Sequence, residues 1–216
     1  MRFQAVLFDL DGTLLDTLED LANAMNKVLE SRGLPVHPVG AYRLMVGDGV
    51  ENLVKRALPE SMRDPQSLAL SVAAMREEYS RNWALRTRPY PGVPQLLEGL
   101  SSKEIPMAVL SNKPHDFTER MVAEMLGSWR FQVVLGERPG VPRKPDPTIA
   151  LQIASQLGIP PKYFVYLGDT DTDMRTAVAA GMFPVGALWG FRTARELLSS
   201  GARRLLSTPQ ELLELL

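Results

Sequence analysis

The stretch FQAVLFDLDGTLLD (residues 3–16) places an apolar run directly before a cluster of aspartates. The run is continuous and does not alternate with polar residues, which is typical of a strand buried on both faces of a parallel sheet. Asp9, Asp11 and Asp16 then follow within a few residues. They form either a polar turn at the end of the strand or a carboxylate cluster that holds a cation and contacts a substrate.

Composition excludes several classes of protein. The chain has 216 residues, of which 45% are hydrophobic and 23% charged, and a net charge of -1, so nothing favours nucleic acid or an anionic membrane as a partner. The absence of cysteine excludes disulfides, zinc–thiolate sites and a cysteine nucleophile. No apolar run approaches the roughly 20 residues of a membrane span, and the N-terminal run resembles a buried strand more than a signal peptide. We therefore expect a cytoplasmic protein.

Strand and helix patterns alternate in the second half of the chain. Apolar runs predict further strands at residues 106–112, 131–136 and 163–169, and a weaker one at 183–189. Helical patterns that end in glycine lie between them, as in DFTERMVAEMLG, which closes at Gly127. This alternation predicts an α/β fold built from right-handed βαβ units around a parallel sheet.

Residues 17–87 interrupt this alternation because they show helix after helix and no strand pattern. TLEDLANAMNKVLESRG has apolar residues at helical spacing and a glycine stop at Gly33, and Asp16 before it is either an N-cap or part of the site. The Pro/Gly-rich RPYPGV (88–93) then marks a hinge. We expect a core of residues 1–16 and 88–216 with a helical insert at 17–87.

The polar residues of interest lie just past the predicted strand ends. They are Asp9, Asp11, Gly12 and Thr13 after the first strand, Ser111, Asn112 and Lys113 after the second, Lys144 in the loop after the third, and Asp169, Asp171 and Asp173 after the fourth. Ligands of an open parallel sheet bind outside the carboxyl ends of its strands. We therefore expect these residues to meet at one edge of the sheet.

This set of residues suits phosphoryl transfer. An aspartate can attack phosphorus and form an aspartyl-phosphate, and oxygen ligands suit Mg²⁺. Lys144 and the Ser111 hydroxyl can hold phosphate oxygens, while Gly12 lets backbone N–H groups approach an anion and Thr13 adds a donor. With no cysteine and no G-x-S-x-G motif, an aspartate is the available nucleophile.

DLDGTLLD, SNK, RKPDP and GDTDTD, in this order, resemble the four motifs of the haloacid dehalogenase-like hydrolase superfamily, and the resemblance covers essentially the whole chain. It implies a Rossmann-like parallel-sheet core with a helical cap domain inserted after the first motif. It also implies an enzyme, a Mg²⁺-dependent phosphatase that hydrolyses a small phosphomonoester through an aspartyl-phosphate.

The resemblance also assigns roles to individual positions. Asp9 matches the nucleophile, Asp11 the general acid/base, and Lys144 the lysine that neutralises nucleophile and phosphate. Phosphate binding is implied for Gly12, Thr13, Ser111 and Asn112. Metal binding is implied for Asp9, for the Asp11 carbonyl, for Asp169, and for Asp173, which would hold either a metal-bound water or Lys144.

The insert is expected to determine which substrate binds. Its segment MVGDGVENLVKRAL (45–58) is similar to the cap loop of phosphoglycolate phosphatases, with Asp48 where that subgroup often has Asn. Gly47 and Gly49 precede a helix start, where backbone N–H groups can meet an anion, and Arg56 could add positive charge. A glycine-rich turn followed by solvated basic residues is the structural alternative. The resemblance makes 2-phosphoglycolate, giving glycolate and phosphate, the leading substrate.

Other functions stay open. A related phosphatase would act on a sugar phosphate, a nucleotide or pyrophosphate. A β-phosphoglucomutase-like phosphotransferase would need a cap histidine where this chain has Leu21, and a haloalkanoate dehalogenase would not use Asp11. A non-enzymatic protein that kept the fold would not need the intact set of motifs. We expect a small-molecule partner, no nucleic acid or membrane, and a monomer or homodimer.

Overall fold

The computed structural model describes residues 3–216 and divides the chain into two compact units. One unit, here called the core, ends at Leu15 and resumes from Pro89 to the C-terminus. The other, here called the cap, is Asp16–Arg88. Two short strands, β2 (Leu15–Asp16) and β3 (Arg88–Pro89), pair with each other where the chain leaves the core and returns to it.

A six-stranded parallel sheet forms the centre of the core. Its strands are β1 (Ala5–Phe8), β4 (Met107–Pro114), β5 (Val133–Glu137), β6 (Phe164–Gly168), β7 (Phe183–Ala187) and β8 (Arg204–Leu206), in the order β5-β4-β1-β6-β7-β8. From β1 the chain continues outward to β4 and β5 on one side, and through β6, β7 and β8 on the other. The carboxyl end of β1 is therefore a topological switch point, the place where such sheets bind ligands. The predicted α/β fold is confirmed.

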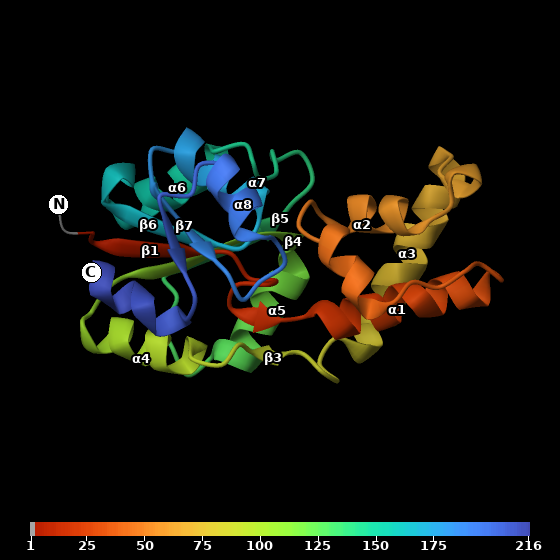
Figure 1. The fold of residues 1–216 in the computed structure, drawn as a ribbon, viewed down its shortest axis with the longest axis horizontal. Helices are drawn as coiled ribbons and strands as arrows, with labels where there is room; N and C mark the ends of the chain where they lie inside the picture. The colour runs from red at the N-terminus through yellow and green to blue at the C-terminus, as the bar shows by residue number, and fades with distance from the viewer. Residues whose placement is uncertain (1–2) are drawn as a thin grey trace. The chain divides into compact units, whose positions relative to one another are not determined.

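Helices cover both faces of this sheet. Those of the core are α4 (Val93–Ser102), α5 (His115–Leu126), α6 (Thr148–Leu157), α7 (Asp171–Ala179) and α8 (Ala194–Ser199), with 3-10 turns η3 (Pro161–Tyr163) and η4 (Pro209–Leu215). Figure 1 shows α4 and α5 on one face and α6, α7 and α8 on the other. The sequence did not indicate β8, because three residues at a sheet edge, beginning with the exposed Arg204, carry too short an apolar pattern.

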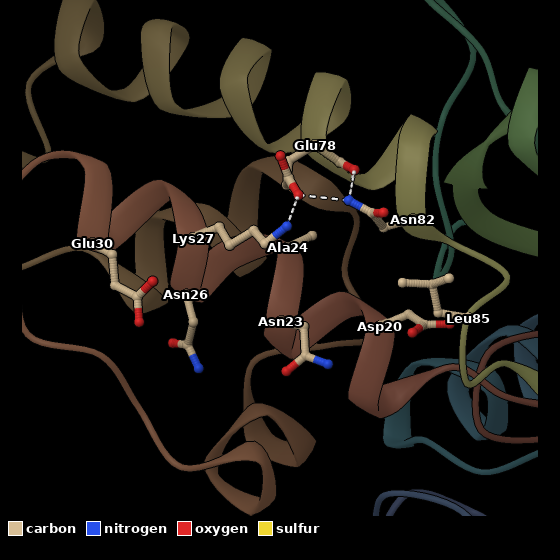
Figure 2. A pocket seen from close by; sticks show the side chains of 9 residues that line it. All are labelled: Asp20, Asn23, Ala24, Asn26, Lys27, Glu30, Glu78, Asn82 and Leu85. Carbon is tan, nitrogen blue, oxygen red and sulfur yellow. Dashed lines mark hydrogen bonds and ion pairs between the residues drawn. The ribbon is translucent and has the colours of Figure 1, made fainter.

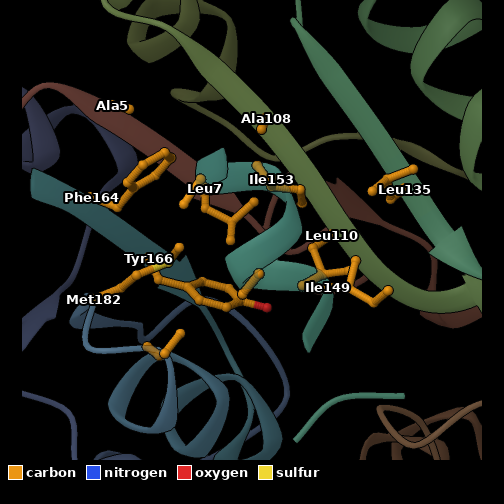
Figure 3. Close-up of a cluster of buried hydrophobic side chains, with 14 residues drawn as sticks. Ala5, Leu7, Ala108, Leu110, Leu135, Ile149, Ile153, Phe164, Tyr166 and Met182 are labelled. Carbon is orange, nitrogen blue, oxygen red and sulfur yellow. The ribbon is translucent and has the colours of Figure 1, made fainter. Parts of the chain in front are cut away.

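One layer of the core packs under α6 and α7. Leu7 of β1, Tyr166 of β6 and Ile153 of α6 belong to a cluster of buried side chains that also includes Met182 (Figure 3). All four residues of β1 are buried, which is why its sequence is apolar without alternation. This packing fixes the backbone that leads into Asp9 and Asp11.

The cap is helical, as its sequence pattern indicates. It contains α1 (Leu18–Ser31), η1 (Val39–Leu44), α2 (Val50–Ala57), η2 (Glu60–Met62) and α3 (Pro65–Asn82). Thr17, and not Asp16, is the N-cap residue of α1. The buried Asp20 carboxylate accepts bonds from Arg86 N at 2.9 Å and from Thr87 N and Oγ1 at 2.8 Å each. The two ends of the cap are thereby tied together.

A cavity of about 300 Å³ lies within the cap, lined by α1, α3 and Leu85 (Figure 2). Lys27 Nζ of α1 donates to Glu78 of α3 at 2.7 Å, and Asn82 Nδ2, also of α3, donates to the same carboxylate at 2.6 Å. None of the four sequence motifs lines this cavity, so the candidate site lies elsewhere. Among the residues described, no helix has the length and apolarity that crossing a membrane requires.

Candidate active site

Three buried carboxylates gather at the carboxyl edge of the sheet. Asp9 follows β1, Asp169 follows β6, and Asp173 lies in the first turn of α7. One oxygen from each carboxylate lies within 4.8 Å of the other two. Adjacent parallel strands bring together residues that are far apart in sequence, and the Asp9 N–H fixes the register by donating to Leu167 O at 3.0 Å.

Lys144 lies between two of these carboxylates. Its Nζ donates to Asp9 Oδ1 at 2.6 Å, to Asp173 Oδ1 at 2.7 Å and to Leu110 O at 3.0 Å. The Lys144 side chain is only 3% exposed, so this buried ammonium depends on its anionic partners. Asn112 holds the lysine in place, because its side-chain amide donates to Lys144 O at 3.1 Å and accepts from Lys144 N at 3.0 Å. The predicted phosphate contact of Asn112 stays a prediction.

Asp169 is held from two sides. Its Oδ1 accepts from Thr13 Oγ1 at 2.8 Å, and its Oδ2 accepts from Phe191 N at 2.8 Å. Gly12 adopts φ of 89° beside it, and a Cβ there would collide with the Asp169 carboxylate and the Phe191 ring. In this structure the Thr13 hydroxyl therefore orients Asp169, and its predicted contact with phosphate stays a prediction.

Burial and mutual repulsion shift the pKa values of the cluster. Loss of water around Asp9, together with the charge of Asp173, raises the pKa of the Asp9 carboxyl well above its usual value, although Lys144 opposes this. The same two causes, burial and then Asp173, raise the pKa of Asp169 to about 7. Burial disfavours the ammonium of Lys144, but Asp173 and Asp9 outweigh that cost and raise its pKa. The lysine stays charged.

The donor set of this cluster fits a divalent cation. Three buried carboxylates face a single ammonium, so the ionised cluster carries an excess of negative charge that the fold does not neutralise. Hard cations such as Mg²⁺ bind carboxylate and carbonyl oxygens, which are the donors present. Each of the three already accepts hydrogen bonds within the fold, Asp9 and Asp173 from Lys144 and Asp169 from Thr13 and Phe191. A carboxylate has about four lone-pair sites, so each keeps further oxygen lone pairs for a cation.

This excess charge predicts a pH-dependent stability. The pKa of Asp169 is about 7 in the folded protein, against 3.8 for an aspartate exposed to water, as in the unfolded chain. At pH values between these two, the native protein therefore binds more protons than the unfolded chain. Stability of the metal-free protein should therefore fall as pH rises from about 4 to 7, by on the order of 4 kcal/mol. Thermal unfolding in EDTA at a series of pH values measures this loss of stability.

Mg²⁺ should raise Tm more at pH 8 than at pH 5, because the carboxylates are ionised at the higher pH. A metal effect independent of pH would contradict the charge argument. Asp169→Asn, the matched control, should flatten the slope.

Asp11 has a partner that sequence reasoning did not assign. Lys113 Nζ donates to Asp11 Oδ1 at 3.1 Å and to Oδ2 at 3.2 Å. Ser111, which is predicted to bind phosphate, is buried next to Lys113 in the chain. The Ser111 Oγ accepts a hydrogen bond from Lys113 N at 3.2 Å. The lysine stands in the SNK motif at the carboxyl end of β4. The strand-end rule, by which ligands bind just past the carboxyl ends of parallel strands, selected Ser111 and applies equally to Lys113.

A second group of residues that the sequence reasoning missed follows β7. Besides the Phe191 bond to Asp169, Trp189 Nε1 donates to Thr13 O at 2.9 Å. The sequence pattern alone suggests only a packing role for Trp189. Applying the strand-end rule to the weaker fifth strand would have drawn attention to this loop.

In the cap, Gly47 and Gly49 have φ of 123° and 88°, and Gly49 is the N-cap residue of α2. Arg56 forms an ion pair with Asp48, and its Nη1 donates to Met45 O at 2.9 Å. The Arg56 charge is therefore already balanced within the cap. Substrate contacts by Gly47, Gly49 and Arg56 stay predictions.

Comparison with known proteins identifies the family of this chain. The family described as haloacid dehalogenase-like hydrolase matches residues 6–187. The chain belongs to this family. The expected superfamily membership is thus confirmed, and so is the expectation of an enzyme.

Similar proteins cover nearly the whole chain. The phosphoglycolate phosphatase of Aquifex aeolicus is 33% identical over 213 residues, which is 99% of this chain and 96% of that protein. The phosphoglycolate phosphatase of Pseudomonas putida is 33% identical over 196 residues, covering 89% of this chain and 72% of that protein. The crystal structure of a Lactobacillus delbrueckii subsp. bulgaricus protein superposes with a TM-score of 0.92 at 30% identity, covering 99% of this chain and 98% of that one. The expected resemblance to phosphoglycolate phosphatases is confirmed.

Proposed function

We propose that this chain is a Mg²⁺-dependent phosphatase of small phosphomonoesters, with 2-phosphoglycolate as its substrate. The observation that carries the proposal is the Lys144-bridged pair of Asp9 and Asp173, with Asp11 two residues from the nucleophile. The names of the Aquifex and Pseudomonas relatives support the choice of substrate.

In the proposed first step, an Asp9 carboxylate oxygen attacks phosphorus, and the bond from phosphorus to the leaving oxygen breaks. Asp11, as the acid, gives its proton to that oxygen and so releases an alcohol in place of an alkoxide. Lys144 lies 2.6 Å from Asp9 Oδ1, where its ammonium can stabilise negative charge on the nucleophile and on the transferred phosphoryl group.

In the second step, the Asp11 carboxylate takes a proton from water while the water oxygen attacks phosphorus. The acyl–phosphate bond breaks, and Asp9 and inorganic phosphate are released. Mg²⁺ held by Asp9, the Asp11 carbonyl and Asp169 would neutralise charge on the phosphoryl oxygens, with Asp173 as a fourth candidate ligand.

The experiment that tests the function measures phosphate release from 2-phosphoglycolate, hexose phosphates, nucleotides and pyrophosphate, each with Mg²⁺ and with EDTA. We expect Mg²⁺-dependent release, fastest from 2-phosphoglycolate. A clear preference for another phosphate compound would keep the chemistry and replace the substrate. No release from any compound would overturn the proposal.

Asp11→Asn tests the acid/base role. The amide keeps the size of the side chain and leaves the backbone carbonyl unchanged, so metal affinity should stay close to that of the wild type. The amide cannot exchange the proton, and we expect kcat to fall about 10²- to 10⁴-fold. Steady-state kinetics and Mg²⁺-dependent Tm measure the two quantities. Wild-type turnover in this variant would remove Asp11 from the mechanism.

The structure gives no support to a phosphomutase. Leu21 is buried in α1 at the place where a mutase would need a histidine. The two histidines of the chain lie elsewhere. His37 Nε2 is 2.9 Å from Ala57 O, and His115 Nδ1 accepts from Gly136 N at 3.2 Å.

A further inference from the structure

Two buried lysines enter the candidate site, and they contact different carboxylates. Lys144 bonds Asp9 and Asp173, on the side of the nucleophile. Lys113 bonds Asp11, the proposed acid. The Lys113 side chain is 4% exposed, against 13% for Asp11, so the fold buries a second ammonium beside the group that would protonate the leaving oxygen. A buried charge of this kind is stable only next to an anionic or strongly polar partner.

The backbone around Lys113 is fixed at both of its polar groups. Its N–H donates to Ser111 Oγ at 3.2 Å, and its carbonyl accepts from Thr118 Oγ1 of α5 at 3.1 Å. Burial of the side chain and its two bonds to Asp11 restrict the rotamers that it can adopt from this anchored backbone. Lys113 therefore presents a positioned charge, unlike an exposed lysine that samples many rotamers.

Lys113 Nζ lies at the Asp11 carboxyl group, which the leaving oxygen must also approach. A general acid acts from about 2.6–3.2 Å, so the leaving oxygen must lie at that distance from an Asp11 oxygen. Lys113 Nζ lies 3.1 and 3.2 Å from the two Asp11 oxygens. In 2-phosphoglycolate the carboxylate is bonded to the carbon that follows the leaving oxygen, so ordinary bond lengths keep the carboxylate oxygens within about 4 Å of that oxygen.

We infer that Lys113 is the specificity-determining residue of the proposed phosphatase, and that it selects leaving groups with a carboxylate next to the phosphoester oxygen by pairing with that carboxylate. This inference rests on the proposed function. It assigns to the core a selectivity that the sequence alone suggested for Arg56 of the cap, which is already paired with Asp48.

Two esters of similar size test this. 2-Phosphoglycolate carries the carboxylate, and 2-hydroxyethyl phosphate has a neutral CH₂OH in its place. Wild type should show the larger kcat/KM for 2-phosphoglycolate by at least about 100-fold, since the neutral analogue offers the buried ammonium no second anion. Lys113→Met should lower kcat/KM for 2-phosphoglycolate at least about 20-fold more than it lowers kcat/KM for 2-hydroxyethyl phosphate. Lys113→Arg, which keeps the charge, should regain part of the selectivity.

The controls separate selectivity from mere positioning of Asp11. Lys162→Met removes an exposed lysine of η3 and should leave both constants unchanged. Equal losses for both esters in Lys113→Met would mean that Lys113 only orients Asp11, and would overturn the inference. If Lys113→Met does not fold, the wild-type ratio still decides, because similar kcat/KM values for the two esters overturn the inference while the phosphatase proposal stands. Release from neither ester, nor from any other phosphate compound, means that the function itself has failed.

Discussion

Asp9→Asn should abolish turnover, with kcat reduced on the order of 10⁴-fold or more, while the protein stays folded. The amide has nearly the shape of the carboxylate and can still accept from Lys144 through its oxygen. It cannot attack phosphorus to form the acyl phosphate. Single-turnover and steady-state phosphate release measure the loss.

The same substitution should not lower stability in the absence of metal. Burial and Asp173 raise the pKa of Asp9, which means that the fold disfavours its ionised form. Above the folded-state pKa the wild type must hold that charge, whereas Asn is neutral at every pH. Metal-free Asp9→Asn should therefore have a Tm equal to or above that of wild type, measured by thermal unfolding in EDTA.

A stable variant without activity would separate the nucleophile from a structural role. Mass spectrometry of the assayed sample controls for deamidation, which would restore the aspartate at position 9. Wild-type turnover in a sample shown to have kept the amide would overturn the covalent mechanism. Inactivity with a lower Tm would instead make Asp9 a structural carboxylate.

Lys144→Met is the second large effect, and here activity and stability should fall together. The substitution keeps an unbranched side chain but removes the ammonium between Asp9 and Asp173. Breaking a buried ion pair by removing one partner costs about 3–5 kcal/mol, which for a chain of this size lowers Tm by roughly 10 °C. Loss of the donor to the phosphoryl group should lower kcat about 10²- to 10³-fold.

A double variant shows which part of this loss is electrostatic. Adding Asp173→Asn to Lys144→Met removes one uncompensated carboxylate, and the Asn oxygen can still accept from Thr170 N at the start of α7. Stability should recover in part, while kcat should stay low because the lysine is still missing. The exposed Lys162→Met is again the matched control. An unchanged Tm in Lys144→Met would contradict the charge balance argued for the cluster.

The fold was predictable because its signals are local. Continuous apolar runs such as 3–10 identify buried strands, and glycine stops identify helix ends, without knowledge of the tertiary structure. β8 escaped this reasoning because a three-residue edge strand has little apolar surface to reveal it. β2 and β3, with two residues each, escaped for the same reason.

The residues of the candidate site could be selected from the sequence, but their partners could not. The strand-end rule selects Asp9, Lys144 and Asp169 because it needs only the order of strands. The bond from Lys113 to Asp11 joins residues 102 positions apart, and it depends on which strands are neighbours and on side-chain direction. The Phe191 N–H on Asp169 is a backbone donor, which carries no residue-type signal at all.

The bonds from Arg86 and Thr87 to Asp20, together with the β2–β3 pair, give the inserted segment a property of its own. Because its two ends are held side by side, the length and content of the chain between them make little difference to loop closure in the core. The insert can therefore vary in sequence while its two points of attachment to the core stay fixed. Exchange of the segment from Leu21 to Leu85, which keeps Asp20, Arg86 and Thr87, for one from another protein of this family should leave the core sheet and its carboxylate cluster assembled. Evolution of a new substrate range through the insert would then proceed without refolding the catalytic unit.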